Sequence, residues 1–221
     1  MTKNRYFNAV EMLIVIAIIG ILISILLPAL SKARAISMRN VCQANLKHAG
    51  IAYTLYVYDN KKLFPTMQHS GYRYAMGKEA DNVGFYERPL NHYLDTSEFA
   101  ECPADKGHPM WNLNNVFNAW GSSYTAPWNN DIYAIGYLSH RTKPKSMDFF
   151  EHTDKKIIMG DHPFWANRSW ADGRSHWHWN GDLRRANLLF LDMHVEFFTF
   201  PAEYNSFAHE EPLDINRWKF Y

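Results

Sequence analysis

The residue types best suited to metal binding gather in the segment DGRSHWHWNGD, residues 172–182. If this segment is extended, His176 and His178 share one face, because alternate side chains of a strand point the same way. Two imidazoles at this spacing can ligate one metal ion together with a carboxylate such as Asp161. Without a matched third ligand the signal is weak, and an aromatic loop with solvated histidines is the simpler interpretation.

Motifs of nucleophilic catalysis and phosphate binding do not occur in the sequence. There is no Gly-x-Ser-x-Gly nucleophile elbow, and there is no glycine-rich loop of the kind that cradles a phosphate group. Isolated pairs of aspartate and glutamate are too common to indicate hydrolysis. We therefore interpret the chain as non-enzymatic.

The two cysteines, Cys42 and Cys102, do not form a Cys-x-x-Cys motif for zinc or redox chemistry. If both lie outside the cytosol they can pair, and a bridge between positions so far apart restricts the unfolded chain by about 4 kcal/mol in the loop-entropy model. Pro103 fixes the backbone beside Cys102. We predict a disulfide, with two buried free thiols as the alternative.

The charge balance excludes one class of partner. The chain has 221 residues, with 23 Lys and Arg against 22 Asp and Glu, whereas nucleic-acid binders usually show a clustered basic patch. We expect no nucleic-acid partner. Seven of the eight tryptophans lie within residues 111–179. Because this region has few aliphatic residues, we expect aromatic rings to build its core, and a stacking surface for sugars or proteins is the alternative.

A membrane segment is predicted near the N-terminus. Residues 12–31 are twenty consecutive uncharged residues, and as a helix they span about 30 Å, the thickness of the hydrocarbon core. A cleaved signal peptide is the alternative, with an Ala-x-Ala pattern at residues 33–35. Glu11 stands at the start of the segment, where the positive end of the helix dipole favours a carboxylate. A charge deep in a bilayer costs about 2.5–3.5 kcal/mol, so Glu11 needs an interfacial position or a partner.

One long helix is predicted over residues 8–60. Pro28 removes a backbone donor and predicts a kink in a helix that continues beyond Lys32. The second part of the helix carries an apolar stripe with spacings of three and four residues, formed by Cys42, Leu46, Ala49, Tyr53 and Tyr56. Turn residues at 59–62 and Pro65 predict its end.

The rest of the chain predicts irregular structure followed by a small sheet. Up to about residue 154 we expect short helices and loops packed by aromatic rings. Strands are predicted at 156–160, 186–191 and 195–200, with the last two in a hairpin around Asp192 and Met193. A type I′ turn would place Met193 at positive φ, so we expect a longer or different turn.

The predicted fold class is therefore α+β, with a long N-terminal helix packed on a loop-rich globular domain that has a small antiparallel sheet. We divide the chain into three parts: a leader and transmembrane helix at residues 1–31, the extramembrane half of the helix at 32–60, and a globular domain at 61–221.

The N-terminal residues resemble those of type IV pilins and type II secretion pseudopilins. The resemblance rests on Phe7, Glu11 four residues later, the Ile- and Leu-rich run, and Pro28. In that family a prepilin peptidase cuts before the phenylalanine and methylates the new amine, and the glutamate pairs with the amine of a neighbouring subunit. The resemblance implies processing between Tyr6 and Phe7, where the family has glycine in place of Tyr6, and a role for Glu11 in assembly.

Segments farther along the chain resemble a large pseudopilin-like family. They are CQANLKHAGIAYTLYVYDN, ECPADK, GSSY, IIMGD and ANLLFLDMHVEFF. The C-terminal signature of that family is a histidine, nine spacers and Asp-Gly, and here Asp182 replaces the histidine and Met193 the glycine. Some pseudopilins hold a C-terminal loop with calcium, which makes Asp172, Asp182 and Asp192 candidate ligands. The chain has no loop with closely alternating acidic residues, so we assign no cofactor beyond a possible Ca²⁺.

The resemblance implies a membrane-anchored subunit of a type II secretion or type IV pilus-like fibre. Its partners are then other pilin-like subunits, the assembly machinery and the inner membrane. We expect one membrane pass, with Lys3 and Arg5 in the cytoplasm and the globular domain in the periplasm or at the cell surface. The alternative is a membrane-tethered extracytoplasmic binding module that does not enter a fibre, with carbohydrate as its candidate ligand.

Overall fold

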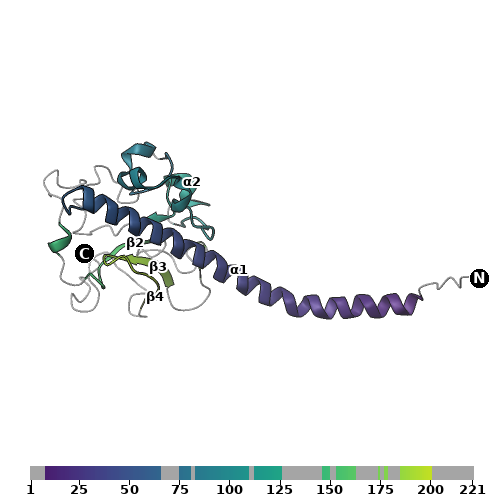
Figure 1. Ribbon diagram of the computed structural model, residues 1–221. Helices are drawn as coiled ribbons and strands as arrows, with labels where there is room; N and C mark the ends of the chain where they lie inside the picture. Colours follow the sequence, from purple (N-terminus) through teal and green to yellow (C-terminus); the bar gives the residue numbers. More distant parts are fainter. Residues whose placement is uncertain are drawn as a thin grey trace, which may run out of the picture. The chain divides into compact units, whose positions relative to one another are not determined.

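A computed structural model of the chain describes residues 8–65, 75–80, 83–109, 112–125, 146–149, 153–162, 174, 177–178 and 185–200. The chain divides into two compact units, Met1–Ser37 and Met38–Tyr221. Within the described residues the fold is α+β, as predicted: a long helix that packs on a four-stranded antiparallel sheet and on loop regions (Figure 1).

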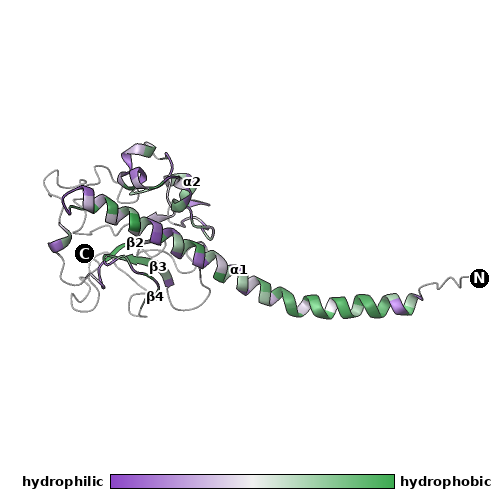
Figure 2. Ribbon diagram, in the orientation of Figure 1, coloured by the Kyte–Doolittle hydropathy of each residue, from purple (hydrophilic) through white to green (hydrophobic). Residues whose placement is uncertain are grey.

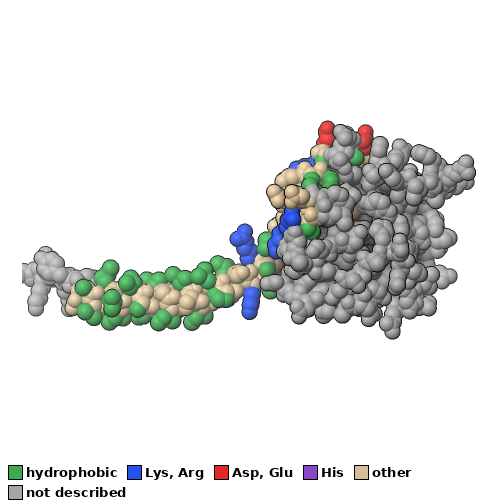
Figure 3. Space-filling model, turned by 180° about the vertical axis from the view of Figure 1, so that it is seen from behind, with side chains coloured by type: hydrophobic (Ala, Val, Ile, Leu, Met, Phe, Trp, Pro, Cys, Tyr) green, Lys and Arg blue, Asp and Glu red, His purple; other side chains and the backbone are tan. Residues whose placement is uncertain are grey.

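Helix α1, Ala9–Asp59, is continuous over 51 residues, within a residue of the predicted bounds at each end. All described residues of the first unit, 8–37, are exposed in the single chain. Figure 2 colours most of this part of the helix as hydrophobic, and Figure 3 shows apolar side chains along it, with Lys and Arg side chains towards its end. A helix that is apolar all round normally lies inside a large core or a membrane.

The second part of α1 belongs to the second unit and is buried along one side. The buried residues follow spacings of three and four, which confirms the predicted stripe except that Tyr56 is half-buried. They are Cys42, Asn45, Leu46, Ala49, Gly50, Ala52, Tyr53 and Val57. Lys61 and Lys62 end the helix in the left-handed conformation, with φ of 56° and 64°, and the Lys62 amide donates to the Val57 carbonyl at 2.8 Å.

The sheet has the strand order β1-β2-β3-β4, with every neighbouring pair antiparallel. Its strands are β1 Tyr124–Thr125, β2 Ile157–Asp161, β3 Arg185–Phe190 and β4 Val195–Thr199. The three predicted strands are confirmed to within one residue at each end. Strand β1 was not predicted, because two residues are too few to form an alternating pattern.

Strand β3 is buried on both faces and separates two hydrophobic clusters. Leu189 belongs to the cluster that contains the stripe of α1, and Leu188 and Phe190 belong to the cluster on the other face, with Phe198. The approach of α1 to the hairpin is close: a Cβ on Gly50 would lie 3.2 Å from Leu189 Cδ1. Glycine at this position therefore allows the helix to pack closely on the sheet.

The turn between β3 and β4 differs from a type I′ turn, as expected, but Met193 still has a positive φ of 67°. The Met193 amide donates to the Phe190 carbonyl at 2.9 Å, and the Phe190 amide donates to the His194 carbonyl at 3.0 Å. A turn closed by a left-handed residue normally has glycine there. The Met193 side chain is half-buried and packs on the main core, next to Gly50, which compensates for the strained backbone.

The region between α1 and the sheet contains short helices, as predicted. They are η1 Phe85–Glu87, η2 Pro89–Tyr93, η3 Ser97–Ala100, α2 Val116–Trp120 and η4 Met147–Phe149. Buried polar side chains connect them: Arg88 donates to the Trp120 carbonyl at 3.1 Å, and Asn91 donates to the carbonyls of Gly77 and Phe85 at 2.6 and 2.8 Å. Trp120 and Trp177, the two described tryptophans, are buried, as expected for core residues.

Candidate functional site

The start of α1 positions Glu11, the acidic residue of the apolar segment. The Asn8 side chain accepts a hydrogen bond from the Val10 amide at 3.3 Å, and Glu11 Oε2 accepts one from the Asn8 amide at 2.9 Å. Asn8 thus acts as the N-cap of α1 through the Val10 amide, and the bond from Asn8 to Glu11 is the glutamate half of a helix-capping box. Glu11 is exposed in the single chain, so its carboxylate caps its own helix and is also accessible to a partner. Tyr6 and Phe7 lie outside the described residues.

Pro28 lies in the interior of α1, and the helix continues through it, as expected. Proline has no amide hydrogen, so the Ser24 carbonyl has no donor from the residue four positions later. The Ser24 hydroxyl donates to the Ile21 carbonyl at 2.8 Å, one turn before the proline. The predicted kink at Pro28 stays a prediction.

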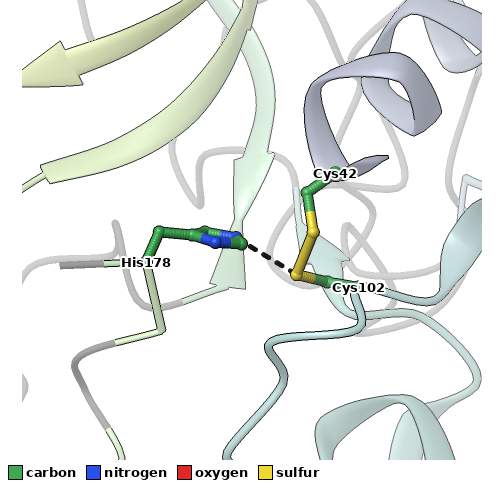
Figure 4. A group of neighbouring side chains, drawn as sticks. All are labelled: Cys42, Cys102 and His178. Carbon is green, nitrogen blue, oxygen red and sulfur yellow. Dashed lines mark hydrogen bonds between the residues drawn. A yellow bond between two sulfur atoms is a disulfide. The ribbon is translucent and has the colours of Figure 1, made fainter. Parts of the chain in front are cut away.

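The two cysteines come from separate elements and meet in the core of the second unit. Cys42 lies in α1, Cys102 follows η3, and the structure joins them in a disulfide with Cα atoms 5.3 Å apart (Figure 4). This separation is usual for a disulfide. Both residues are almost completely buried. The bond ties the helix to the segment after η3, which is the arrangement expected from the sequence.

A half-buried carboxylate, Asp105, fixes the backbone that follows Cys102. Asp105 accepts hydrogen bonds of 2.8–3.0 Å from the amides of Gly107, Val116 and Phe117 and from the Ser123 hydroxyl. The Ser123 hydroxyl oxygen accepts in turn from the Cys102 amide at 3.0 Å. Burial is the main influence on Asp105 and raises the pKa of its carboxyl, although the hydrogen bonds act to lower it.

The His178 side chain points at this disulfide (Figure 4). Its Nε2 atom lies 3.2 Å from Cys102 Sγ and 3.5 Å from Asp161 Oδ2, and the side chains of His178 and Asp161 are only 1% and 2% exposed. Asp161 is the last residue of β2. The Asn187 amide and side chain, on the neighbouring strand β3, donate to Asp161 Oδ2 at 2.7 and 2.9 Å.

The hydroxyl of Tyr124 borders the disulfide from strand β1. It lies 3.5 Å from the carbonyl oxygen of Cys42, at the limit of a hydrogen bond. Complete burial and the nearby charge of Asp161 raise the pKa of Tyr124 well above its ordinary value. The phenol therefore stays protonated at neutral pH, and it is a donor rather than a charged group.

The structure thus brings together some of the residues considered in the sequence. His178 lies next to Asp161, and both lie beside the cysteine pair. His176, Asp172 and Asp182 lie outside the described residues. Asp192 is in the β3–β4 turn, and its carboxylate contacts His194 within that turn.

Three side chains that organise this region were not singled out from the sequence: Asp105, Ser123 and Asn187. Asp105 and Ser123 do lie in the segments ECPADK and GSSY, which resemble segments of pseudopilin-like proteins, although no role for these two residues was predicted from the sequence. Asn187 lies inside a strand predicted from its apolar neighbours. No local pattern marks its contact with Asp161, because the two residues are 26 positions apart.

No protein-family model, curated protein or solved structure matches this chain. The architecture itself is pilin-like: an apolar N-terminal helix whose second part packs on a small antiparallel sheet. Within the described residues, α1 is the one helix long and apolar enough to span a membrane, and a signal sequence near the N-terminus would have the same properties.

Proposed function

We propose that this protein is a pseudopilin-like structural subunit of a type II secretion or type IV pilus-like fibre. It is anchored in the inner membrane by the first part of α1 before assembly, with its N-terminus in the cytoplasm and its globular domain outside. Its partners are further pilin-like subunits and the assembly machinery. It performs no reaction of its own.

The observation that supports this proposal is the difference in surface between the first and second parts of α1. Residues 12–31 of α1 expose apolar side chains on all sides, whereas from Cys42 onward the same helix is buried along one stripe. A segment apolar all round is stable in a membrane, or among identical segments in the core of a fibre. The stripe packs within the globular unit, of which the second part of the helix is a member.

The position of Glu11 gives the proposal its mechanism. A carboxylate at the edge of an apolar segment is costly to bury unless it meets an opposite charge. In a fibre the amine of a neighbouring subunit is that charge, as the resemblance to pilins implies. Pairing of this kind adds new subunits in one register, because an unpaired carboxylate among apolar helices is unfavourable.

Substitutions at Glu11 test the mechanism, because they can separate charge from helix capping. Glu11→Gln keeps an oxygen that can accept from the Asn8 amide and loses only the charge, whereas Glu11→Ala loses both. We expect both variants to insert into the membrane and neither to enter fibres, as measured by sheared-fibre yield against membrane content. Glu79→Gln, which changes an exposed carboxylate of the globular unit, is the control and should assemble normally.

Fibres of normal yield from Glu11→Gln would contradict pairing through charge. Fibres from Glu11→Gln but not from Glu11→Ala would show that capping of α1, rather than the charge, is what assembly requires.

The intact mass of the native protein tests processing. A chain that lacks its first six residues and carries one added methyl group supports cleavage between Tyr6 and Phe7, and hence assembly. A full-length chain in the membrane supports instead the membrane-tethered binding module. This measurement does not depend on the effect of any substitution.

A further inference from the structure

Three side-chain atoms that can bind a metal ion lie close together at the disulfide. The sulfurs of Cys42 and Cys102 and a ring nitrogen of His178 all lie within 4.8 Å of one another. They come from three separate parts of the second unit: helix α1, the segment after η3, and the segment before β3. Two cysteines and a histidine are a common part of a tetrahedral zinc site.

A carboxylate lies beside this group and is already oriented. Asn187 holds Asp161 Oδ2 with two hydrogen bonds. The other oxygen, Oδ1, is buried and has no hydrogen-bond partner among the described residues. A buried acceptor without a donor is unfavourable unless a cation or proton satisfies it. His178 Nε2 lies 3.5 Å from Oδ2, so a metal ion bound to this nitrogen would lie near the Asp161 carboxylate, which is therefore the candidate fourth ligand.

We propose that, when the disulfide is reduced, Cys42, Cys102, His178 and Asp161 form a binding site for one Zn²⁺ ion. The same two cysteines then link the helix to the segment after η3 in either of two ways, through a sulfur–sulfur bond or through the metal. The inference concerns the globular unit and does not depend on whether the chain enters a fibre.

The chemical change is a two-electron reduction followed by metal binding. A dithiol reductant supplies two electrons and two protons, its own sulfurs become joined, and the Cys42–Cys102 bond opens to two thiols. Zinc then displaces both thiol protons, because thiolates rather than thiols ligate metals. His178 binds through neutral Nε2.

The distances of the oxidised site are compatible with this change. Zinc bonds of about 2.3 Å to sulfur and about 2.0 Å to nitrogen place tetrahedral S and N ligands about 3.5 Å apart. Nε2 of His178 is already 3.2 Å from Cys102 Sγ. Opening the disulfide separates the two sulfurs to roughly 3.8 Å in such a site, a small movement for side chains whose Cα atoms are 5.3 Å apart.

The test uses the full chain in detergent. The chain is reduced with dithiothreitol, freed of it by anaerobic gel filtration and titrated with Co²⁺, which gives thiolate-to-metal absorption in the near ultraviolet. We expect one Co²⁺ per chain, displaced by an equal amount of Zn²⁺. The oxidised chain should show no such absorption, because its sulfurs are bonded to each other.

Single substitutions identify the remaining ligands. We expect His178→Gln to weaken Zn²⁺ binding at least about 100-fold, and Asp161→Asn at least about tenfold, since loss of even an outer-shell partner costs 10–100-fold. His92→Gln, which alters an exposed histidine of η2, should bind as the unaltered chain does. Circular dichroism of each oxidised variant checks folding while the disulfide is intact.

Three results would overturn the proposal. One is that the reduced chain takes up no Co²⁺; another is that His178→Gln, with a native-like spectrum when oxidised, binds as tightly as the unaltered chain. The third is that the reduced chain unfolds and added Zn²⁺ does not restore its fold.

Discussion

At the scale of single residues, Asp105 is the side chain whose hydrogen bonds support most of the structure around the disulfide. Its carboxylate receives hydrogen bonds from three backbone amides and one hydroxyl, and through Ser123 it is linked to the backbone of Cys102. Removing the carboxylate would therefore leave several buried donors without an acceptor.

We predict that Asp105→Ala lowers the free energy of unfolding by about 3 kcal/mol or more, because each unsatisfied buried donor costs about 1–3 kcal/mol. Chemical denaturation followed by tryptophan fluorescence measures the change. Asp95→Ala, at an exposed aspartate, is the matched control and should stay within about 0.5 kcal/mol of the unaltered chain. An equally small effect at Asp105 would show that water replaces its hydrogen bonds.

The raised pKa of Asp105 predicts a dependence of stability on pH. Between the unfolded and the folded pKa, the folded chain holds this proton more strongly than the unfolded chain does. The contribution to stability is therefore complete below the unfolded pKa of about 4, and it is lost as the pH rises through the folded pKa. The stability difference between the unaltered chain and Asp105→Asn should shrink over this range. A difference that grows with pH would mean that the folded pKa is lowered instead.

At the scale of elements, the disulfide connects α1 to a segment that has little regular structure of its own. The two cysteines are 60 positions apart. We predict that the double variant with alanine at Cys42 and Cys102 loses about 4 kcal/mol of stability in the loop-entropy model. Thermal unfolding measures the loss, and peptide mapping without reduction should recover a peptide that joins the two cysteines. Free thiols in oxidised protein would contradict the pairing.

The β3–β4 turn gives a second prediction at this scale. Met193→Ala and Met193→Gly both remove the packing of the side chain, but only glycine relieves the left-handed backbone. We therefore expect the glycine variant to be more stable than the alanine variant by about 1 kcal/mol. The control is Ala119→Gly inside α2, where we expect the glycine variant to be less stable than the unaltered chain, because glycine is unfavourable within a helix. If alanine is the more stable residue at position 193 as well, the turn must rearrange in the variant.

Elements with a sustained pattern could be predicted, and contacts between distant residues could not. The bounds of α1 followed from an apolar run and a stripe, and β2 to β4 followed from short β-branched and aromatic runs. Strand β1 exists only because Tyr124 and Thr125 pair with β2, so its own sequence carries no signal. The candidate metal site of His176, His178 and Asp161 was suggested by residue type alone, and an aromatic loop with solvated histidines was the simpler interpretation. The position of Asn187 depends on strand register.

At the scale of the whole molecule, the division of the chain after residue 37 predicts that the second unit can be produced without the apolar segment. A chain that begins at Met38 keeps the buried stripe of α1, the sheet and both cysteines, and lacks the apolar segment. We expect it to be soluble and to form its disulfide, whereas the full chain should resist extraction from membranes by carbonate. Aggregation of the shortened chain, with its cysteines reduced, would show that the second unit does not fold without the first.

The covalent link between Cys42 and Cys102 also decides which part of the chain can bear mechanical load. When the two termini are pulled apart, tension passes along α1 to Cys42, crosses directly to Cys102, and continues towards the C-terminus. The intervening residues, including the rest of α1 and the first three short helices, are bypassed. Reduction should therefore add roughly 200 Å to the contour length in a single-molecule stretching experiment. A chain linked in this way keeps residues 43–101 free of tension, whereas the four strands, which all follow Cys102, bear the load.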